Sequence, residues 1–336
     1  MTAEKPSIAV LGAGSYGTSL AMVLARNNLN VTLWARNSKS IEEMAETREN
    51  RLYVPGIKLP NNIRVSANLK ECVETHRDLL VVVPSHAFRP LIQTIKPFLS
   101  EEARLAWASK GLDPVSGMLL DSVVAEELEH ALPCAVLSGP TFAKELALNL
   151  PTATTLAAND DPWLQDLTAY FHNENFRVYS SHDMTGVQLC GAVKNVIAVG
   201  AGLADGLGFG ANARTALITR GIAELTRLGM ACGGAQATFS GMAGLGDLVL
   251  TCTDDQSRNR RFGLALGRGE SQEDAQKTIG QVVEAVRNTK EVYQLACKQN
   301  VEVPIIEQIY QVLYENKSPF EAAKQLMTRE LKSESE

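Results

Sequence analysis

Two charged residues stand alone in long uncharged stretches of this 336-residue chain, and each could take part in proton chemistry. Lys194 is the only charged residue within residues 184–204, and Asp247 is the only one within residues 228–253. Desolvation lowers the pKa of a lysine toward the range in which it transfers protons. A snorkelling lysine and an aspartate that caps a helix would leave the same pattern. If both side chains are buried, each needs a partner, and the simplest arrangement pairs them.

A hydroxyl, a guanidinium and an amide follow one another at Ser257, Arg258 and Asn259, just before an apolar helical run. Bidentate hydrogen bonds from an arginine, together with the amides and dipole of a helix N-terminus, make a good oxyanion site. Arg260 and Arg261 follow directly, so a solvated basic helix face is the alternative. The cluster favours a phosphorylated substrate over a plain carboxylate, although arginine binds both.

Near the N-terminus a short apolar run leads into a G-x-G-x-x-G motif. In this motif Gly12 allows a tight turn, Gly14 lets the backbone approach a pyrophosphate, and Gly17 lets the next helix pack closely. Ser15 and Tyr16 would offer backbone amides to the anion at a helix N-terminus. A helical run and a second apolar strand follow and complete a βαβ unit, so we predict a dinucleotide site.

The end of the second predicted strand indicates which dinucleotide binds. NAD-specific sites place an Asp or Glu there for the ribose 2′-hydroxyl, whereas this chain has Arg36, with no carboxylate nearby. An arginine suits a 2′-phosphate, and a solvated arginine at a strand end is the alternative. We therefore expect NADPH as the preferred cofactor, with NADH as the second choice.

The order of predicted elements indicates an α/β N-terminal domain of Rossmann type, with a mainly parallel, doubly wound sheet, followed by an all-α C-terminal domain. Helical patterns alternate with eight short apolar runs, at residues 8–11, 31–34, 63–65, 79–83, 105–108, 135–137, 153–157 and 176–179. After Gly186 the apolar spacing is helical, as in the series Val187, Cys190, Val193, Ile197 and the series starting at Val282. We place the dinucleotide-binding domain at residues 1–185, the helical substrate-binding domain at 186–331, and a frayed tail at 332–336.

Ligands of open α/β sheets bind at the carboxyl ends of strands, which singles out three further segments. Lys110 follows the predicted strand 105–108, where its cation could face a substrate or lie exposed in a loop. The other segments are residues 84–86, whose His86 we do not expect to be catalytic, and residues 138–143.

Composition excludes several classes of function. A net charge of −6 argues against a nucleic-acid or membrane surface, and 45% hydrophobic residues suffice for a core in each of two domains. The six cysteines are scattered without a C-x-x-C pair, so we expect reduced thiols and no metal site. Neither a signal sequence nor an uninterrupted apolar stretch of ~18 residues is evident, so we expect a cytoplasmic protein without membrane insertion.

Together these segments resemble the NAD(P)-dependent glycerol-3-phosphate dehydrogenases of the bacterial biosynthetic type. They occur in the order of that family over nearly the whole chain. The matching segments are Gly12-Ala13-Gly14-Ser15-Tyr16-Gly17-Thr18, Val83-Pro84-Ser85, Lys110-Gly111-Leu112, residues 138–145, Lys194-Asn195, residues 212–221, Gly244-Leu245-Gly246-Asp247-Leu248 and Ser257-Arg258-Asn259.

The resemblance implies a homodimer that reduces dihydroxyacetone phosphate to sn-glycerol 3-phosphate, the backbone precursor of phospholipids. It implies that Lys194 is the proton donor or acceptor, with Asp247 beside it. The substrate site would comprise Lys110, Gly139, Thr141, Lys194, Asp247, Ser257, Arg258 and Asn259. The nucleotide contacts would comprise Ser15, Tyr16, Arg36, Lys110, Ala143, Arg258, Val282 and Glu284, in addition to the glycines of the motif.

One position departs from the family, which usually has Glu-Gly where this chain has Glu284-Ala285. This departure concerns the local turn and the contact of Glu284, and it does not touch the fold or the reaction that the resemblance implies. Without the resemblance, the same residues would also fit other two-domain reductases, such as hydroxyacid or ketopantoate enzymes. A non-catalytic NADPH sensor is a further alternative. Lys194 and Asp247 argue against it, because a sensor does not need two charged residues in otherwise uncharged stretches.

Overall fold

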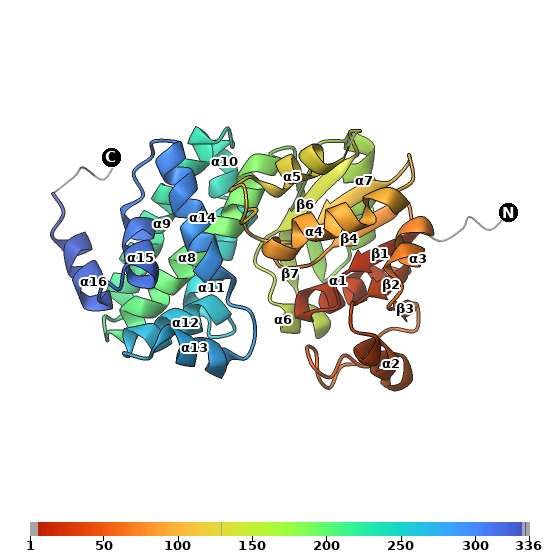
Figure 1. The fold of residues 1–336 in the computed structure, drawn as a ribbon, viewed down its shortest axis with the longest axis horizontal. Helices are drawn as coiled ribbons and strands as arrows, with labels where there is room; N and C mark the ends of the chain where they lie inside the picture. The colour runs from red at the N-terminus through yellow and green to blue at the C-terminus, as the bar shows by residue number, and fades with distance from the viewer. Residues whose placement is uncertain (1–5, 129, 331–332, 334–336) are drawn as a thin grey trace. The chain divides into compact units, whose positions relative to one another are not determined.

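The computed structural model describes residues 6–128, 130–330 and 333 (Figure 1). The chain forms two compact units, unit 1 with residues 1–188 and unit 2 with residues 189–336. The predicted frayed tail, residues 332–336, lies outside the described residues except for Ser333.

Unit 1 contains a single sheet of eight strands in the order β3-β2-β1-β4-β5-β6-β7-β8. All neighbouring strands are parallel except β6 and β7, which are antiparallel. All eight predicted strands are present, which confirms the mainly parallel sheet. Its elements are β1 (Ser7–Leu11), α1 (Ser15–Arg26), β2 (Asn30–Trp34), α2 (Ser38–Thr47), β3 (Ile63–Ser66), α3 (Leu69–Glu74), β4 (Asp78–Val81), α4 (Ser85–Ile95), η1 (Lys96–Phe98), β5 (Arg104–Trp107), α5 (Leu120–Glu127), β6 (Cys134–Ser138), α6 (Ala143–Ala147), β7 (Thr152–Ala158), α7 (Asp161–Phe171) and β8 (Phe176–Ser181).

The central strands are recognisable in the sequence because both of their faces are covered. Ile8, Val10 and Leu11 in β1 are fully buried, as are Leu79 and Leu80 in β4. Strands of this kind appear as continuous apolar runs rather than as alternating patterns. The strand order reverses between β1 and β4, and at such a reversal the carboxyl ends of the strands leave room for a ligand.

Unit 2 is built from helices, and its described residues contain no strand. This confirms the predicted all-α C-terminal domain. Its elements are α8 (Met184–Gly206), which starts in unit 1, α9 (Ala211–Ala231), α10 (Gln236–Phe239), the π-helical turn η2 (Met242–Gly246), α11 (Asp247–Thr253), α12 (Arg258–Gly267), α13 (Gln272–Ile279), α14 (Glu284–Lys298), α15 (Pro304–Tyr314) and α16 (Pro319–Met327).

Helix α8 is long and apolar enough to cross a membrane by composition, but its apolar window is entirely buried inside the protein. We therefore read it as a core helix. The helical series predicted to start at Val282 is wrong at its first residue, because Gly280 ends α13 in the left-handed conformation (φ 66°) and Val283 has an extended backbone (φ −96°, ψ 96°). Residues 281–283 form the connection, and α14 begins only at Glu284.

A buried glutamate of α9 caps helix α15. Glu224 is 1% exposed, and its two carboxylate oxygens accept hydrogen bonds from the backbone N–H of Ile305 (2.7 Å) and Ile306 (3.2 Å). Val303, at the N-cap position of α15, provides no side-chain cap. Burial raises the pKa of Glu224 to about 7, against the opposing effect of the two backbone hydrogen bonds.

We expect Glu224 to make the stability of the protein depend on pH. Its folded pKa lies above the unfolded value, so its stabilising contribution is complete below about pH 4.5 and is lost as the pH rises through about 7. Relative to a Glu224→Gln variant, which cannot titrate, the free energy of unfolding should fall by on the order of 3 kcal/mol over this window. Urea titrations of both proteins at several pH values measure this difference. A constant difference would contradict the assignment.

Candidate active site

The glycine-rich turn of unit 1 has the geometry that its three glycines predict. Gly12 has φ 130°, and a Cβ atom there would lie 2.2 Å from the carbonyl oxygen of Val82. A Cβ atom on Gly17 would lie 1.8 Å from the carbonyl oxygen of Gly12, so helix α1 touches the turn itself. Gly14, the N-cap of α1, has no heavy atom within 4 Å of its Cβ position. Two glycines therefore build the turn, and the third leaves its outer face open.

Arg36 lies beside this turn at the carboxyl end of β2. The N–H of Gly12 donates to the carbonyl oxygen of Trp34 (3.0 Å), which ties the two strand ends together. Arg36 is exposed, one residue before Asn37, whose side chain caps helix α2. Arg36 is thus an exposed cation just after β2, the strand end that the nucleotide-binding fold places near the ribose.

Four of the predicted site residues form one cluster at the same edge of the sheet. The hydroxyl groups of Tyr16 and Thr141 are hydrogen-bonded at 2.8 Å. Lys110 Nζ donates to the carbonyl oxygen of Gly139 (3.2 Å) and lies 5.6 Å from the centroid of the Tyr16 ring. Ala143 is connected as well, because its carbonyl oxygen accepts a hydrogen bond from Ser19 of α1 (2.6 Å). The first turn of α1, the Lys110 loop and the segment after β6 are therefore brought together.

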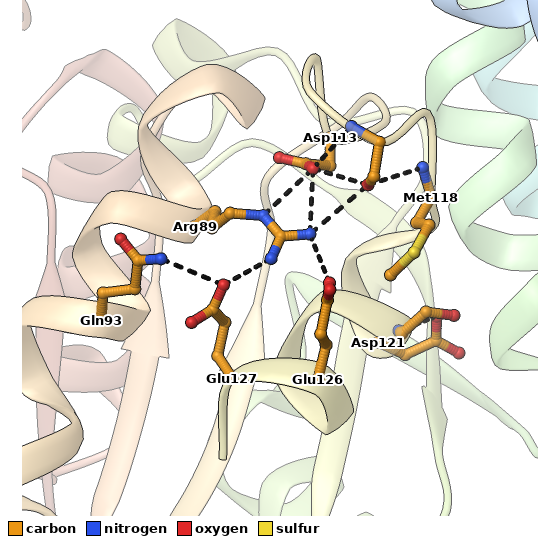
Figure 2. Close-up of polar contacts among 9 residues, drawn as sticks. Arg89, Gln93, Asp113, Met118, Asp121, Glu126 and Glu127 are labelled. Atoms are coloured by element: carbon orange, nitrogen blue, oxygen red, sulfur yellow. Dashed lines mark hydrogen bonds and ion pairs between the residues drawn. The ribbon is translucent and has the colours of Figure 1, made fainter.

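A polar network fixes the loop that carries Lys110 (Figure 2). Arg89 of α4 donates to Asp113 (3.1 Å) and to Glu126 (2.7 Å), and also pairs with Glu127. The Ser116 hydroxyl donates to the same Asp113 oxygen as Arg89 Nε (2.6 Å). Burial by itself would raise the pKa of Asp113, but the bonds from Ser116 and Arg89 lower it overall. Asp113 thus stays ionised and anchors the loop three residues beyond Lys110.

These features of unit 1 fit a dinucleotide. The open face at Gly14 admits a pyrophosphate, the first turn of a twelve-residue helix follows it, and Arg36 supplies positive charge at the next strand end. No described group of three or more His, Cys, Asp and Glu residues could hold a metal ion.

In unit 2 the two isolated charges meet. Lys194 Nζ donates to Asp247 Oδ1 at 2.5 Å, and the side chains are only 8% and 1% exposed. Thr251, one turn after Asp247 in α11, accepts a second hydrogen bond from Lys194 Nζ (3.2 Å). The Thr251 hydroxyl in turn donates to the carbonyl oxygen of Asp247 (2.6 Å). The predicted pairing is therefore present, and a buried carboxylate holds the ammonium in a fixed direction.

The predicted anion cluster starts a helix, as expected. Ser257 is the N-cap of α12, and its hydroxyl accepts a hydrogen bond from the N–H of Arg260 (3.2 Å). Arg258 is the first residue of α12, is partly exposed, and donates to Gln281 (3.2 Å). Arg260 is instead buried against Asp205 of α8 (2.6 Å). Of these two arginines, only Arg258 is placed to reach a ligand.

The side chain of Asn259, which is partly buried, makes hydrogen bonds within the protein, in a chain of side-chain amides. Its Nδ2 donates to Asn195 Oδ1 (2.8 Å), and Asn195 Nδ2 donates to Asn288 Oδ1 (3.0 Å). Asn259 Oδ1 accepts from the N–H of Ala285 (3.2 Å). The start of α12 is thereby connected with α8, next to Lys194, and with α14.

Sequence reasoning missed Thr251 and the Asn195–Asn288 contact as parts of this arrangement. Thr251 could have been found, because it lies four residues after Asp247 on one helix face. Val282 is half exposed in the connection that leads into α14, and Glu284 is the first residue of this helix. Ala285 has a helical backbone and is fully buried, so alanine is compatible with the position despite the family's usual glycine.

Comparisons with known proteins cover nearly the whole chain. Residues 7–164 match the family model described as NAD-dependent glycerol-3-phosphate dehydrogenase N-terminus, and residues 183–324 match the model of its C-terminus. The glycerol-3-phosphate dehydrogenase [NAD(P)+] of Pseudoalteromonas translucida is 57% identical over 335 residues, covering 99% of this chain and 100% of the relative. That of Photobacterium profundum is 57% identical over 329 residues, covering 98% and 97%.

Solved structures agree with these matches. A crystal structure of glycerol-3-phosphate dehydrogenase from Coxiella burnetii superimposes with a TM-score of 0.94 at 48% identity, covering 97% of this chain and 99% of that chain. A ketopantoate reductase from Ralstonia eutropha shares the fold alone, with a TM-score of 0.61 at 15% identity, covering 94% and 99%.

Proposed function

Since the chain belongs to the family of NAD(P)-dependent glycerol-3-phosphate dehydrogenases, we propose that it reduces dihydroxyacetone phosphate to sn-glycerol 3-phosphate, reversibly and with NADPH as the preferred cofactor. The observation that carries this proposal is the buried Lys194–Asp247 pair in the same unit as an arginine at a helix N-terminus. The pair supplies a directed acid, and the arginine supplies a ligand for a phosphate. A reductase acting on a phosphorylated ketone needs both.

In this proposal Lys194 donates the proton. A bound reduced nicotinamide supplies the hydride that the C2 carbonyl carbon receives. The ammonium of Lys194 donates a proton to the C2 oxygen as negative charge develops on it, and Asp247 and Thr251 hold Nζ in place. In the direction of oxidation the neutral amine accepts this proton from the C2 hydroxyl group.

Arg258 binds the phosphate of the substrate in this proposal, next to Ser257 and Asn259 at the start of α12. Its guanidinium can form two charge-assisted hydrogen bonds to one phosphate, and the amides of the first helical turn face the same anion. Lys110, Gly139 and Thr141 remain predicted substrate contacts of unit 1.

The nucleotide would be held by the turn at Gly12, Gly14 and Gly17 and by the amides of Ser15 and Tyr16. Arg36 would bind its 2′-phosphate. The further contacts that we propose are Lys110, Ala143, Arg258, Val282 and Glu284. We also propose that the protein is a cytoplasmic homodimer that supplies the glycerol phosphate backbone of phospholipids; light scattering on the purified protein measures its oligomeric state.

The reaction is tested by following the absorbance of reduced nicotinamide with several carbonyl substrates. We expect rapid oxidation of NADPH with dihydroxyacetone phosphate and slow oxidation with dihydroxyacetone or ketopantoate. Turnover of ketopantoate instead would identify another two-domain reductase. Binding of NADPH without turnover of any phosphorylated ketone would favour a sensor.

The preference for NADPH should depend on Arg36. In Arg36→Asp the charge that faces a 2′-phosphate is reversed, while the 2′-hydroxyl of NADH gains an acceptor. We expect the affinity for NADPH to fall by on the order of 2 kcal/mol more than that for NADH, the scale of a hydrogen bond to a charged group. Fluorescence titration of both cofactors measures this, with NADH as the internal control. An equal loss for both would show that Arg36 does not bind the 2′-phosphate.

A further inference from the structure

Asn50 touches the glycine-rich turn from inside the protein, although no motif marks it. The residue follows helix α2 and is 2% exposed. Its Nδ2 donates to the carbonyl oxygen of Ala13 (3.0 Å) and to the hydroxyl group of Thr18 (2.8 Å). Both partners belong to the turn or to the first helical turn after it, and Thr18 is fully buried.

The bond to Ala13 determines which way the next amide points. The peptide between Ala13 and Gly14 is trans, so its C=O and N–H point in opposite directions across one plane. Because the oxygen of Ala13 points inward to Asn50, the N–H of Gly14 points away from it. Gly14 also has open space around its Cβ position, so an anion can approach this residue closely.

Asn50 also fixes the segment that follows it. Its carbonyl oxygen accepts hydrogen bonds from the N–H groups of Tyr53 (3.2 Å) and Val54 (2.8 Å). Val54 packs in the hydrophobic core to which Ala13 also belongs. The loop is closed at its base by the bridge between Glu49 and Lys58. The side-chain amide is therefore anchored on both sides and cannot swing away from the turn without opening this loop.

We infer that Asn50 is a positioning residue for nucleotide binding: it holds the Ala13–Gly14 peptide with its N–H outward, ready for the pyrophosphate. This inference rests on the proposed function only in that the turn binds a dinucleotide. Without Asn50 the oxygen of Ala13 lacks its buried donor, and the peptide is free to rotate and to present an oxygen to the phosphate. The cost should then appear in the affinity for the nucleotide rather than in the chemical step.

The test compares Asn50→Ala with a matched control in the same unit. Asn62 uses its Nδ2 in the same way, donating to the carbonyl oxygens of Ala25 (2.7 Å) and Leu29 (2.7 Å) at the far end of α1. Both variants lose an amide with two internal hydrogen bonds, but only Asn50 touches the glycine-rich turn. Fluorescence titration with NADPH, without substrate, should give a Kd raised about tenfold or more in Asn50→Ala and unchanged within about twofold in Asn62→Ala.

Steady-state kinetics provide the second readout. In Asn50→Ala the KM for NADPH should rise in parallel with Kd, while kcat and the KM for dihydroxyacetone phosphate stay within about threefold. An unchanged Kd in folded Asn50→Ala, or an equal rise in Asn62→Ala, would overturn the inference. A parent protein that binds NADPH but does not reduce dihydroxyacetone phosphate would contradict the proposed function and leave this inference standing.

Should Asn50→Ala fail to fold, Thr18→Val serves in its place. Valine has nearly the shape of threonine but removes one of the two acceptors that hold the Asn50 amide. We expect a Kd for NADPH raised about threefold. A Kd equal to that of the parent protein would count against the positioning role.

Discussion

Lys194→Ala should lower kcat by at least ~10²-fold while NADPH still binds, because the positioned proton donor is lost. Lys194 lies in unit 2, 2.5 Å from Asp247, whereas the residues that surround the glycine-rich turn lie in unit 1. Turnover and NADPH titration on the same preparation measure the two effects. A variant that keeps nearly normal turnover would move the role of donor elsewhere, with Lys110 as the next candidate.

Two companion variants separate proton donation from support of the fold. Removing Lys194 leaves the carboxylate of Asp247 buried without its cation, which destabilises a protein by roughly 3–5 kcal/mol. Asp247→Asn should lower turnover less than Lys194→Ala, because Asp247 orients the ammonium and donates no proton. Thr251→Val removes only one acceptor of the ammonium, and we expect a smaller loss still.

Arg258→Lys should lower kcat/KM for dihydroxyacetone phosphate by ~10²-fold or more. A lysine keeps the charge but lacks the planar fork that binds a phosphate through two parallel hydrogen bonds. A loss of ~3 kcal/mol of binding free energy at the phosphate also slows the chemical step, because this binding energy orients the carbonyl group. The same variant should discriminate poorly between dihydroxyacetone phosphate and dihydroxyacetone.

Arg261→Lys is the matched control for this prediction. Arg261 lies on the same helix and is exposed to solvent. The ratio of kcat/KM for the phosphorylated and unphosphorylated ketones should stay unchanged there and fall sharply in Arg258→Lys. A ratio that stays as large in Arg258→Lys as in the parent protein would mean that Arg258 belongs to a solvated basic face.

The sequence was most informative where burial restricts the types of residue that can occupy a segment. Strands covered on both faces must be apolar throughout, so β1 and β4 could be located within two residues of their observed ends. A buried charge must be paired, so Lys194 and Asp247 could be connected across 53 positions. The serine at position 257 caps its own helix, which is a local interaction and therefore visible in the sequence.

Contacts between uncharged polar side chains could not be predicted in the same way. Asn50, Asn195 and Asn288 each find their partners through the tertiary structure, and the sequence around an asparagine does not show whether it lies in a loop or in the core. The start of α14 was missed for a related reason. The apolar spacing continued back through Val282, but Val283 has an extended backbone and the helix begins only after it, which periodicity alone does not show.

The most direct test of the central claim follows the transferred hydrogen itself. NADPH carrying deuterium in the transferable position at C4 of the nicotinamide is incubated with dihydroxyacetone phosphate and the protein, and the product is examined by mass spectrometry and NMR. The account predicts sn-glycerol 3-phosphate with one deuterium at C2, and almost none of it with Lys194→Ala. NADPH that remains unoxidised, or a product without deuterium at C2, would contradict it.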